Sequence, residues 1–567
     1  MARSSIRYAI FAIFAVGIWA SAPVYADGFA GPYLAARNAQ IENDFQAAAR
    51  YFSLALTQDP TNEDLMESAI LALVGQGDIE RAVAVSRRLS ALDSSSQVAN
   101  MVLLAEAVKA EDFDAVIELL QSGVLVGPLV DSLALAWVQV GQGNMSAAIG
   151  SFDKVAGGEG TQSFGLYHKA LALAMVGDLE GAEAILAGQA GTSIPPTRRG
   201  IIAQSEILSQ LERNADALTL IDTVFGDDLD PVLLDLRTRL ESGETLALTS
   251  IRSASDGLAE VFFSVAGALS GEANDGYTIV YTRIAEYLRP DHRDAILLTA
   301  QLLENMGRYE LATAAYNRIP RDDPAFHSAE LGRAEALRLS GKVDAAIEVL
   351  QQLSESHAEQ SAVHVALGDV LRRLSRYDEA GEAYDRALSL YDEPDQAQWS
   401  LFYMRGITHE RMDRWDLAEA DFRKALELKP DQPQVLNYLG YSLVEMQVNL
   451  DEALNMIERA VKARPNDGYI TDSLGWVLYR LGRFDEAVGH MERAAELTPV
   501  DPIVNDHLGD VYWSVGRKRE AEFQWNRAMS FDPAEEDGER IRRKLKVGLD
   551  MVLEEEGASL IPVANGG

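Results

Sequence analysis

Residues 474–499 read LGWVLYRLGRFDEAVGHMERAAELTP, and residues 508–533 read LGDVYWSVGRKREAEFQWNRAMSFDP. Both stretches begin with Leu-Gly, carry alanine at the same two inner places and end in proline. The step from Ala487 to its counterpart Ala521 is 34 residues. A fixed period of this length is typical of solenoids built from stacked supersecondary units. The sequence therefore predicts a repeat fold.

One alanine per unit marks the repeat along the chain. It recurs at steps of 34 to 38 residues at Ala312, Ala346, Ala380, Ala418, Ala453, Ala487 and Ala521. An earlier and weaker ladder, with spacings of about 34, consists of Ala48, Ala82, Ala115, Ala148, Ala182 and Ala217. In each unit apolar residues at helical spacing precede a short turn, and proline closes a second helix. Each unit is predicted to be a helical hairpin whose small residues mark close helix contacts.

These residues resemble the tetratricopeptide repeat, and the match is specific in the C-terminal half. The resemblance implies an all-α fold, a right-handed α-solenoid of helical hairpins, which we expect in two segments. The ladder fails in a stretch that contains GDDLDP at 226–231, so a break is expected there. The predicted organisation is a signal peptide at 1–26, a degenerate solenoid at 27–221, an irregular connection at 222–256, a second solenoid at 257–533, a capping helix at 534–556 and a disordered tail at 557–567.

The capping helix is predicted from an apolar stripe after the period ends. The stripe consists of Ile541, Leu545, Leu549 and Val552. Four basic residues, Arg542, Arg543, Lys544 and Lys546, are expected on the opposite, solvated face.

The first residues predict export. Arg3 and Arg7 precede an apolar run at 8–19, and Val24-Tyr25-Ala26 supplies small residues for cleavage before Asp27. The run is shorter than the roughly 20 residues that span a bilayer, so no membrane segment is expected in the mature chain. The chain has no cysteine, which excludes lipid attachment as a bacterial lipoprotein. The prediction is a periplasmic protein.

Composition and motif searches favour a protein without catalysis. The net charge of −37 opposes binding to nucleic acid. The eight histidines are scattered, and the glycine-rich stretch at 157–160 lacks the Lys-Ser or Lys-Thr of a phosphate loop. Asp227, Asp228 and Asp230 do not have the spacing of an EF-hand. We therefore predict no catalytic residue, no metal site and no cofactor.

Partner binding is predicted on the first helices of the hairpins. In proteins that this chain resembles, these helices line a groove that holds extended peptides. The matching positions, which we call the predicted groove, are Tyr403, Asn437, Tyr441, Tyr469, Asp472, Trp476, Tyr479, Arg480, Asp506, Asp510 and Trp513. Aromatic rings interleaved with carboxylates suit a peptide with apolar and basic side chains. The alternative is that Trp476 and Trp513 belong to the core between repeats.

The layout also resembles periplasmic tetratricopeptide adaptors that dock a carboxyl-terminal processing protease and present cell-wall hydrolases to it. The motifs that carry this resemblance are Asn437-Tyr-Leu-Gly-Tyr441, Asp472-Ser-Leu-Gly-Trp476 and Asp506-His-Leu-Gly-Asp510. Those relatives are outer-membrane lipoproteins, whereas this chain lacks the lipid-bearing cysteine. The expected function is a non-enzymatic scaffold for protein or peptide partners, including such a protease and its substrates. The alternatives are an assembly factor for the outer membrane or for exopolysaccharide export, and an accessory domain of an enzyme complex.

Overall fold

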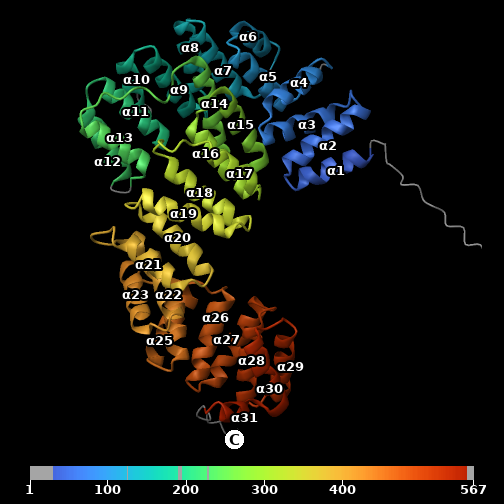
Figure 1. Cartoon of the computed structure of the whole chain (residues 1–567), viewed down its shortest axis with the longest axis vertical. Coiled ribbons are helices and arrows are strands. Elements are labelled where there is room, and N and C mark those ends of the chain that lie inside the picture. The colour runs from blue at the N-terminus through green and yellow to red at the C-terminus, as the bar shows by residue number, and fades with distance from the viewer. Residues whose placement is uncertain (1–29, 93, 124–125, 190–193, 227–228, 558–567) are drawn as a thin grey trace, which may run out of the picture. The chain divides into compact units, whose positions relative to one another are not determined.

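The computed structural model describes residues 30–92, 94–123, 126–189, 194–226 and 229–557 (Figure 1). Across these ranges the chain forms 31 α-helices, one short 3-10 helix and no strand, which confirms the all-α prediction. None of the helices so described is long and apolar enough to cross a membrane. The predicted signal peptide lies outside the described residues, as does the predicted tail apart from Gly557.

The chain divides into two compact units, residues 1–346 and 347–567, and the division falls inside α19 (Val343–Ser356). The connection expected at 222–256 therefore lies within the first unit rather than between two solenoid segments. It is also partly helical, because α13 occupies Pro231–Glu241. The sequence revealed the loss of period but not the packing that follows it.

The first unit, unit 1, contains eighteen complete helices among its described residues. They are α1 (Ala30–Ile41), α2 (Phe45–Gln58), α3 (Glu63–Gln76), α4 (Ile79–Ser90), α5 (Gln97–Lys109), α6 (Phe113–Gln121), α7 (Pro128–Gly141), α8 (Met145–Ala156), α9 (Gln162–Met175), α10 (Leu179–Leu186), α11 (Arg198–Gln210), α12 (Asn214–Phe225), α13 (Pro231–Glu241), α14 (Ala254–Leu269), α15 (Asp275–Leu288), α16 (Arg293–Asn305), α17 (Tyr309–Tyr316) and α18 (Phe326–Leu339).

Most of the alanine ladder in unit 1 is buried at helix contacts. Ala48, Ala82, Ala148, Ala182 and Ala217 are at most 1% exposed. At the third step Val116 is fully buried and Ala115 is only half-buried, so the ladder is offset there by one residue. The buried position follows from where each second helix starts, because the N-cap residue lies four positions before it. At this step the N-cap residue is Asp112 and the buried residue is Val116.

After α13 the chain returns to the earlier helices of unit 1. Helix α14 packs against α5, α7 and α9, and α15 packs against α3 and α5. A Cβ on Gly257 of α14 would lie 2.3 Å from the indole of Trp137 on α7, so only glycine permits this approach. The Glu206 carboxylate accepts from the backbone N–H of Thr249, and Arg289 donates to the carbonyl oxygens of Thr249 and Ser250. These contacts hold the non-helical return segment, residues 242–253, in place.

The second unit, unit 2, is a succession of helical hairpins. Beyond α19 its described residues form α20 (Ser361–Arg373), α21 (Tyr377–Leu388), a 3-10 helix (Gln396–Gln398), α22 (Trp399–Arg411), α23 (Trp415–Leu428), α24 (Pro433–Glu445), α25 (Leu450–Ala463), α26 (Gly468–Arg480), α27 (Phe484–Leu497), α28 (Pro502–Ser514), α29 (Lys518–Met529), α30 (Glu535–Val547) and α31 (Leu549–Glu555). The even-numbered helices from α20 to α28 are the first helices of the hairpins, and the odd-numbered helices from α21 to α29 are the second.

The small residues of unit 2 lie where the sequence predicts close helix contacts. Ala380, Ala418, Ala453, Ala487 and Ala521 are fully buried. The Leu-Gly glycines face large side chains of the second helix, since a Cβ at Gly475 would lie 2.2 Å from Met491 Sδ and one at Gly509 would lie 2.4 Å from the Trp525 ring. Helices α26 to α29 consequently lie side by side, as Figure 1 shows. The predicted helical solenoid is confirmed.

Candidate functional site

The predicted groove is largely filled by the protein's own side chains. Five of its members are buried: Asp472, Trp476, Tyr479, Asp506 and Asp510. Five are half-buried: Tyr403, Asn437, Tyr441, Arg480 and Trp513. Tyr469 is 59% exposed. Positions that share a face in the repeat therefore differ widely in their access to solvent.

Trp476 joins three successive first helices. Its ring stacks on Tyr479 of the same helix and on His507 of α28, with centroid distances of 4.7 and 3.9 Å. Its Nε1 donates to Glu445 Oε1 of α24 at 2.6 Å. With 6% of its surface exposed, the indole makes the contacts of a core residue between repeats. This arrangement agrees with the alternative left open for Trp476.

The buried carboxylates of the predicted groove pair with cations of the chain. Asp472 lies 3.0 Å from His507 Nδ1, and Lys544 Nζ donates to Asp506 and Asp510 at 2.7 Å each. Burial lowers and the Asp472 carboxylate raises the pKa of His507, and the net direction is upward. The pKa of Asp506 is raised, first by burial and then by repulsion from Asp510. Such pairing leaves little charge for a partner to complement.

Lys544 was expected on a solvated face, and that prediction is wrong. Lys544 lies on α30, and its side chain is fully buried between Asp506 and Asp510 of α28. The predicted capping helix is a pair of helices, α30 and α31, and both contact the last repeat. Asp550 of α31 accepts from Trp513 Nε1 at 3.1 Å. The apolar stripe could not predict the burial of Lys544, because this depends on ion pairs with two carboxylates more than thirty residues earlier in the chain.

The part of the predicted groove that keeps unused polar groups lies on α24 and α26. The Oδ1 atom of Asn437 is buried without a hydrogen-bond partner among the described residues. Arg480, half-buried on α26, forms no ion pair or hydrogen bond with any described side chain. Burial raises the pKa of Tyr441, whose phenol lies close enough to Arg480 to feel its charge. Since buried polar groups are usually hydrogen-bonded, these residues have capacity for a polar ligand.

A second candidate site, which the sequence did not predict, is a pocket of about 750 Å³ in unit 1. It is lined by α9, α10, α11, α12 and α14, by the segment 194–197 and by Asp294 at the start of α16. Its walls are mainly apolar, and they include Phe164, Leu186, Ile194, Pro195, Pro196, Ile201, Leu220, Val224 and Phe263. Pockets of this size and lining are typical of binding sites.

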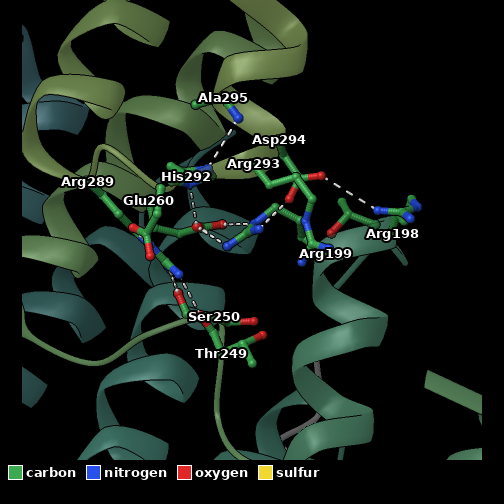
Figure 2. Close-up of polar contacts among 12 residues, drawn as sticks. Arg198, Arg199, Thr249, Ser250, Glu260, Arg289, His292, Arg293, Asp294 and Ala295 are labelled. Carbon is green, nitrogen blue, oxygen red and sulfur yellow. Dashed lines mark hydrogen bonds and ion pairs between the residues drawn. The ribbon is translucent and has the colours of Figure 1, made fainter. Parts of the chain in front are cut away.

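A network of buried charges forms one side of the pocket. Figure 2 shows the Arg199 guanidinium directed at Glu260, to which it donates through Nε and Nη2 at 2.8 and 2.6 Å. The same guanidinium reaches Asp294 through Nη1. Glu260 is 1% exposed and also accepts from the Tyr167 hydroxyl at 2.9 Å and bonds His292 at 3.2 Å. Four donors therefore satisfy one carboxylate.

The start of α16 fixes the tautomer of His292. The Nδ1 atom of His292 caps the helix by accepting a hydrogen bond from the backbone N–H of Ala295 at 3.2 Å. Nδ1 therefore carries no proton, and Nε2 carries the proton that is donated to Glu260. Burial alone would raise the pKa of Glu260, but the Arg199 charge and the His292 hydrogen bond hold it well below its usual range. An ionised carboxylate with no free lone pair is a poor general base. This arrangement suits binding rather than proton transfer.

One sequence signal could have pointed to the pocket. Glu260 stands within the otherwise apolar run GLAEVFFSVAGAL at 257–269. Carboxylates are rarely buried without a partner, so this glutamate predicts a buried cation. The sequence does not say that the cation is Arg199, which lies 61 residues earlier. Asp230, considered above for calcium, instead pairs with Arg198 at 2.9 Å.

Comparisons with known proteins identify the repeat. Two sequence models of the tetratricopeptide repeat match the chain, one at residues 359–431 and the other at 403–468, 447–502 and 473–535. The TPR repeat-containing protein PA4667 of Pseudomonas aeruginosa is 30% identical over 162 residues, which are 28% of this chain and 26% of that protein. Protein O-mannosyl-transferase TMTC1 of Homo sapiens is 24% identical over 173 residues, which are 30% of this chain and 20% of that protein.

The chain thus aligns with about a quarter and a fifth of the length of these two relatives. Among solved structures, the crystal structure of the APC/C hetero-tetramer Cut9-Hcn1 has a TM-score of 0.38 and 16% identity, covering 91% of this chain and 96% of that one. From residue 359 to residue 535, this protein consists of tetratricopeptide repeats.

Proposed function

We propose that this protein is a non-enzymatic scaffold that binds protein or peptide partners in the periplasm through the first helices of unit 2. The observation that carries the proposal is the set of unused polar groups on α24 and α26, where Asn437 and Arg480 lack partners within the described chain. Tetratricopeptide repeats are stacked modules that form extended binding surfaces. Among the described residues, no cluster of His, Cys, Asp or Glu could hold a metal ion.

The surface on which we expect the partner is narrower than the predicted groove. It comprises the accessible members Tyr403, Asn437, Tyr441, Tyr469 and Arg480. The remaining six pack between repeats or against α30 and α31 and act by holding this surface in shape. A partner segment would supply hydrogen-bond acceptors, such as carboxylates or main-chain carbonyls, for the amide Nδ2 of Asn437 and for the guanidinium of Arg480.

The finer part of the proposal concerns location and pathway. The N-terminal residues favour export with cleavage after Ala26, and the resemblance to adaptors of processing proteases favours presentation of cell-wall hydrolases to such a protease. N-terminal sequencing of the purified protein should give Asp27 as its first residue. A chain recovered intact from the cytoplasm would contradict export.

Partner capture tests the scaffold function. Tagged mature protein is incubated with periplasmic extract, and bound proteins are identified by mass spectrometry and then titrated in pure form. We expect Arg480→Ala to weaken binding at least tenfold, since a hydrogen bond to a charged group contributes roughly 1.5–3 kcal/mol. Asn437→Ala should weaken binding about fivefold, since a neutral hydrogen bond contributes about 1 kcal/mol. Arg519→Ala, on the exposed side of second helix α29, is the matched control and should bind as the unaltered protein does. Equal binding by all three variants would refute the proposed surface.

A further inference from the structure

We propose that the unit 1 pocket is a separate binding site for an extended apolar segment of a partner polypeptide, with one peptide bond of that segment paired to Gln204. This inference rests on the proposed scaffold function, because it takes the ligand to be a polypeptide. It concerns a different site from the surface on α22, α24 and α26.

The walls of the pocket determine the apolar part of the ligand. Leu186 of α10, Ile201 of α11, Leu220 and Val224 of α12, and Phe263 of α14 face one space of about 750 Å³. Helix α14, which packs against α5, α7 and α9, also lines this pocket together with α11 and α12. A space of this volume accommodates two or three large apolar side chains, whose removal from water drives binding.

The charges around the pocket argue against an ionic ligand. Arg199 is bound by Glu260 and Asp294, and Arg198 is bound by Asp230 in a two-pronged contact with its Nε and Nη2 atoms at 3.0 and 2.9 Å. A fatty-acid carboxylate would find no free guanidinium here, and an amine would compete with arginine for each carboxylate. The polar part of the ligand is therefore expected to be neutral.

Gln204 specifies what that neutral group is. The residue lines the pocket from α11, is 9% exposed, and its side-chain amide makes no hydrogen bond with any described residue. A carboxamide offers a donor and an acceptor side by side, and a peptide bond offers the complementary acceptor and donor. A hydrocarbon that covered Gln204 would leave its amide desolvated and unpaired, which is costly, so a ligand that pairs with both atoms is favoured.

The test uses blocked tripeptides as probes on the mature full-length chain. Isothermal titration is performed with acetyl-Leu-Phe-Leu-amide, with acetyl-Ser-Ser-Ser-amide and with decanoate. We expect the apolar peptide to bind and the other two to bind at least tenfold more weakly. Gln204→Met, which keeps the side-chain volume but removes the amide, should weaken the apolar peptide about tenfold.

Pocket-filling variants give the second arm. Val224→Trp and Ser264→Phe should each reduce affinity for the apolar peptide at least tenfold, whereas Val176→Trp, at an exposed position of unit 1 outside the pocket, should not change it. Circular dichroism and urea midpoints establish which variants are folded. Unchanged affinity in a folded filling variant, or tighter binding of decanoate than of peptide, would overturn the proposal. These titrations need no natural partner, so a failure here and a failure of partner capture on unit 2 are distinguishable.

Discussion

The two units contain similar helical hairpins but cover their first helices in different ways. In unit 1 the helices α5, α7 and α9 are covered by α14, which follows in sequence only after a return segment. In unit 2 each first helix is covered by the next one, as Trp476 and His507 show, and the last is covered by α30. In unit 1, where α14 returns to earlier helices, a pocket with charged residues along one side remains. In unit 2, where successive first helices stack on one another, aromatic rings and carboxylates form the contacts between repeats.

The comparison also extends to the starts of the second helices. In the first five hairpins of unit 1 the residues that precede these helices are Asp44, Asp78, Asp112, Asn144 and Asp178, and each accepts a hydrogen bond from the backbone N–H three residues on. Later in unit 1, α12 and α17 follow Arg213 and Arg308, whose side chains make no such bond. In unit 2 the corresponding positions are Arg376, Arg414, Asn449, Arg483 and Arg517, and none of these side chains caps the helix. Arg483 instead pairs with Glu486 at 2.6 Å. Side-chain caps therefore mark the early second helices of unit 1, and α12, α17 and these helices of unit 2 lack them.

The largest expected effect is at the end of unit 2. Lys544→Met removes the cation that bonds both Asp506 and Asp510 and should destabilise unit 2 by about 3 kcal/mol, because the two buried carboxylates then keep only the more distant Arg540, at 3.9 and 3.6 Å. Urea unfolding monitored by hydrogen exchange in each unit measures this. The exposed Lys546→Met is the control and should change little. Adding Asp506→Asn to Lys544→Met should restore part of the loss, and no restoration would show that the buried charges are not its cause.

The next effect separates a core role of Trp476 from a binding role. Trp476→Ala should cost about 3 kcal/mol of unfolding free energy, because it empties a packed site between α24, α26 and α28. The exposed Tyr469→Ala should cost far less. Thermal unfolding followed by circular dichroism gives both values. If the Trp476→Ala variant is as stable as the unaltered protein, the indole is not a core residue and its assignment to partner binding in the predicted groove stands.

A smaller effect tests whether damage stays within one unit. Ala487→Leu inserts three carbon atoms into a fully buried contact and should cost about 1–3 kcal/mol. Since each repeat touches mainly its neighbours, trypsin should cleave unit 2 faster while leaving residues before 222 protected. Limited proteolysis with mass spectrometry reads both parts at once. Equal loss of protection in both units would show that they unfold together.

The smallest effect compares the helix starts. Asp78→Ala removes a side-chain cap from α4 and should cost about 1 kcal/mol. Arg483→Ala, at the equivalent place in α27, removes only an exposed ion pair, so its smaller effect should vanish in high salt. Chemical denaturation at low and high salt distinguishes the two. A salt-independent loss in both variants would mean that the helix starts are stabilised alike.

Part of the predicted groove could be assigned from the sequence and part could not. The repeat predicted that Tyr403, Asn437, Tyr441 and Trp476 lie on first helices, and the structure has them on α22, α24 and α26. It did not predict which of them stay accessible, because that depends on the neighbouring repeat and on α30. The pocket in unit 1 escaped prediction because the residues that line it come from six helices spread over more than a hundred positions of the chain.

The sequence by itself determined the helical hairpin, because its small residues recur with a fixed period and the contacts they permit are local. Ala487 and Gly475 define such contacts within one unit of the repeat. Only the tertiary structure decided that 254–288 returns to cover earlier helices, that Lys544 is buried between two carboxylates, and that Arg199 meets Glu260 beside a pocket. These outcomes depend on pairing between residues far apart in the chain, and pairing of that kind leaves no period in the sequence.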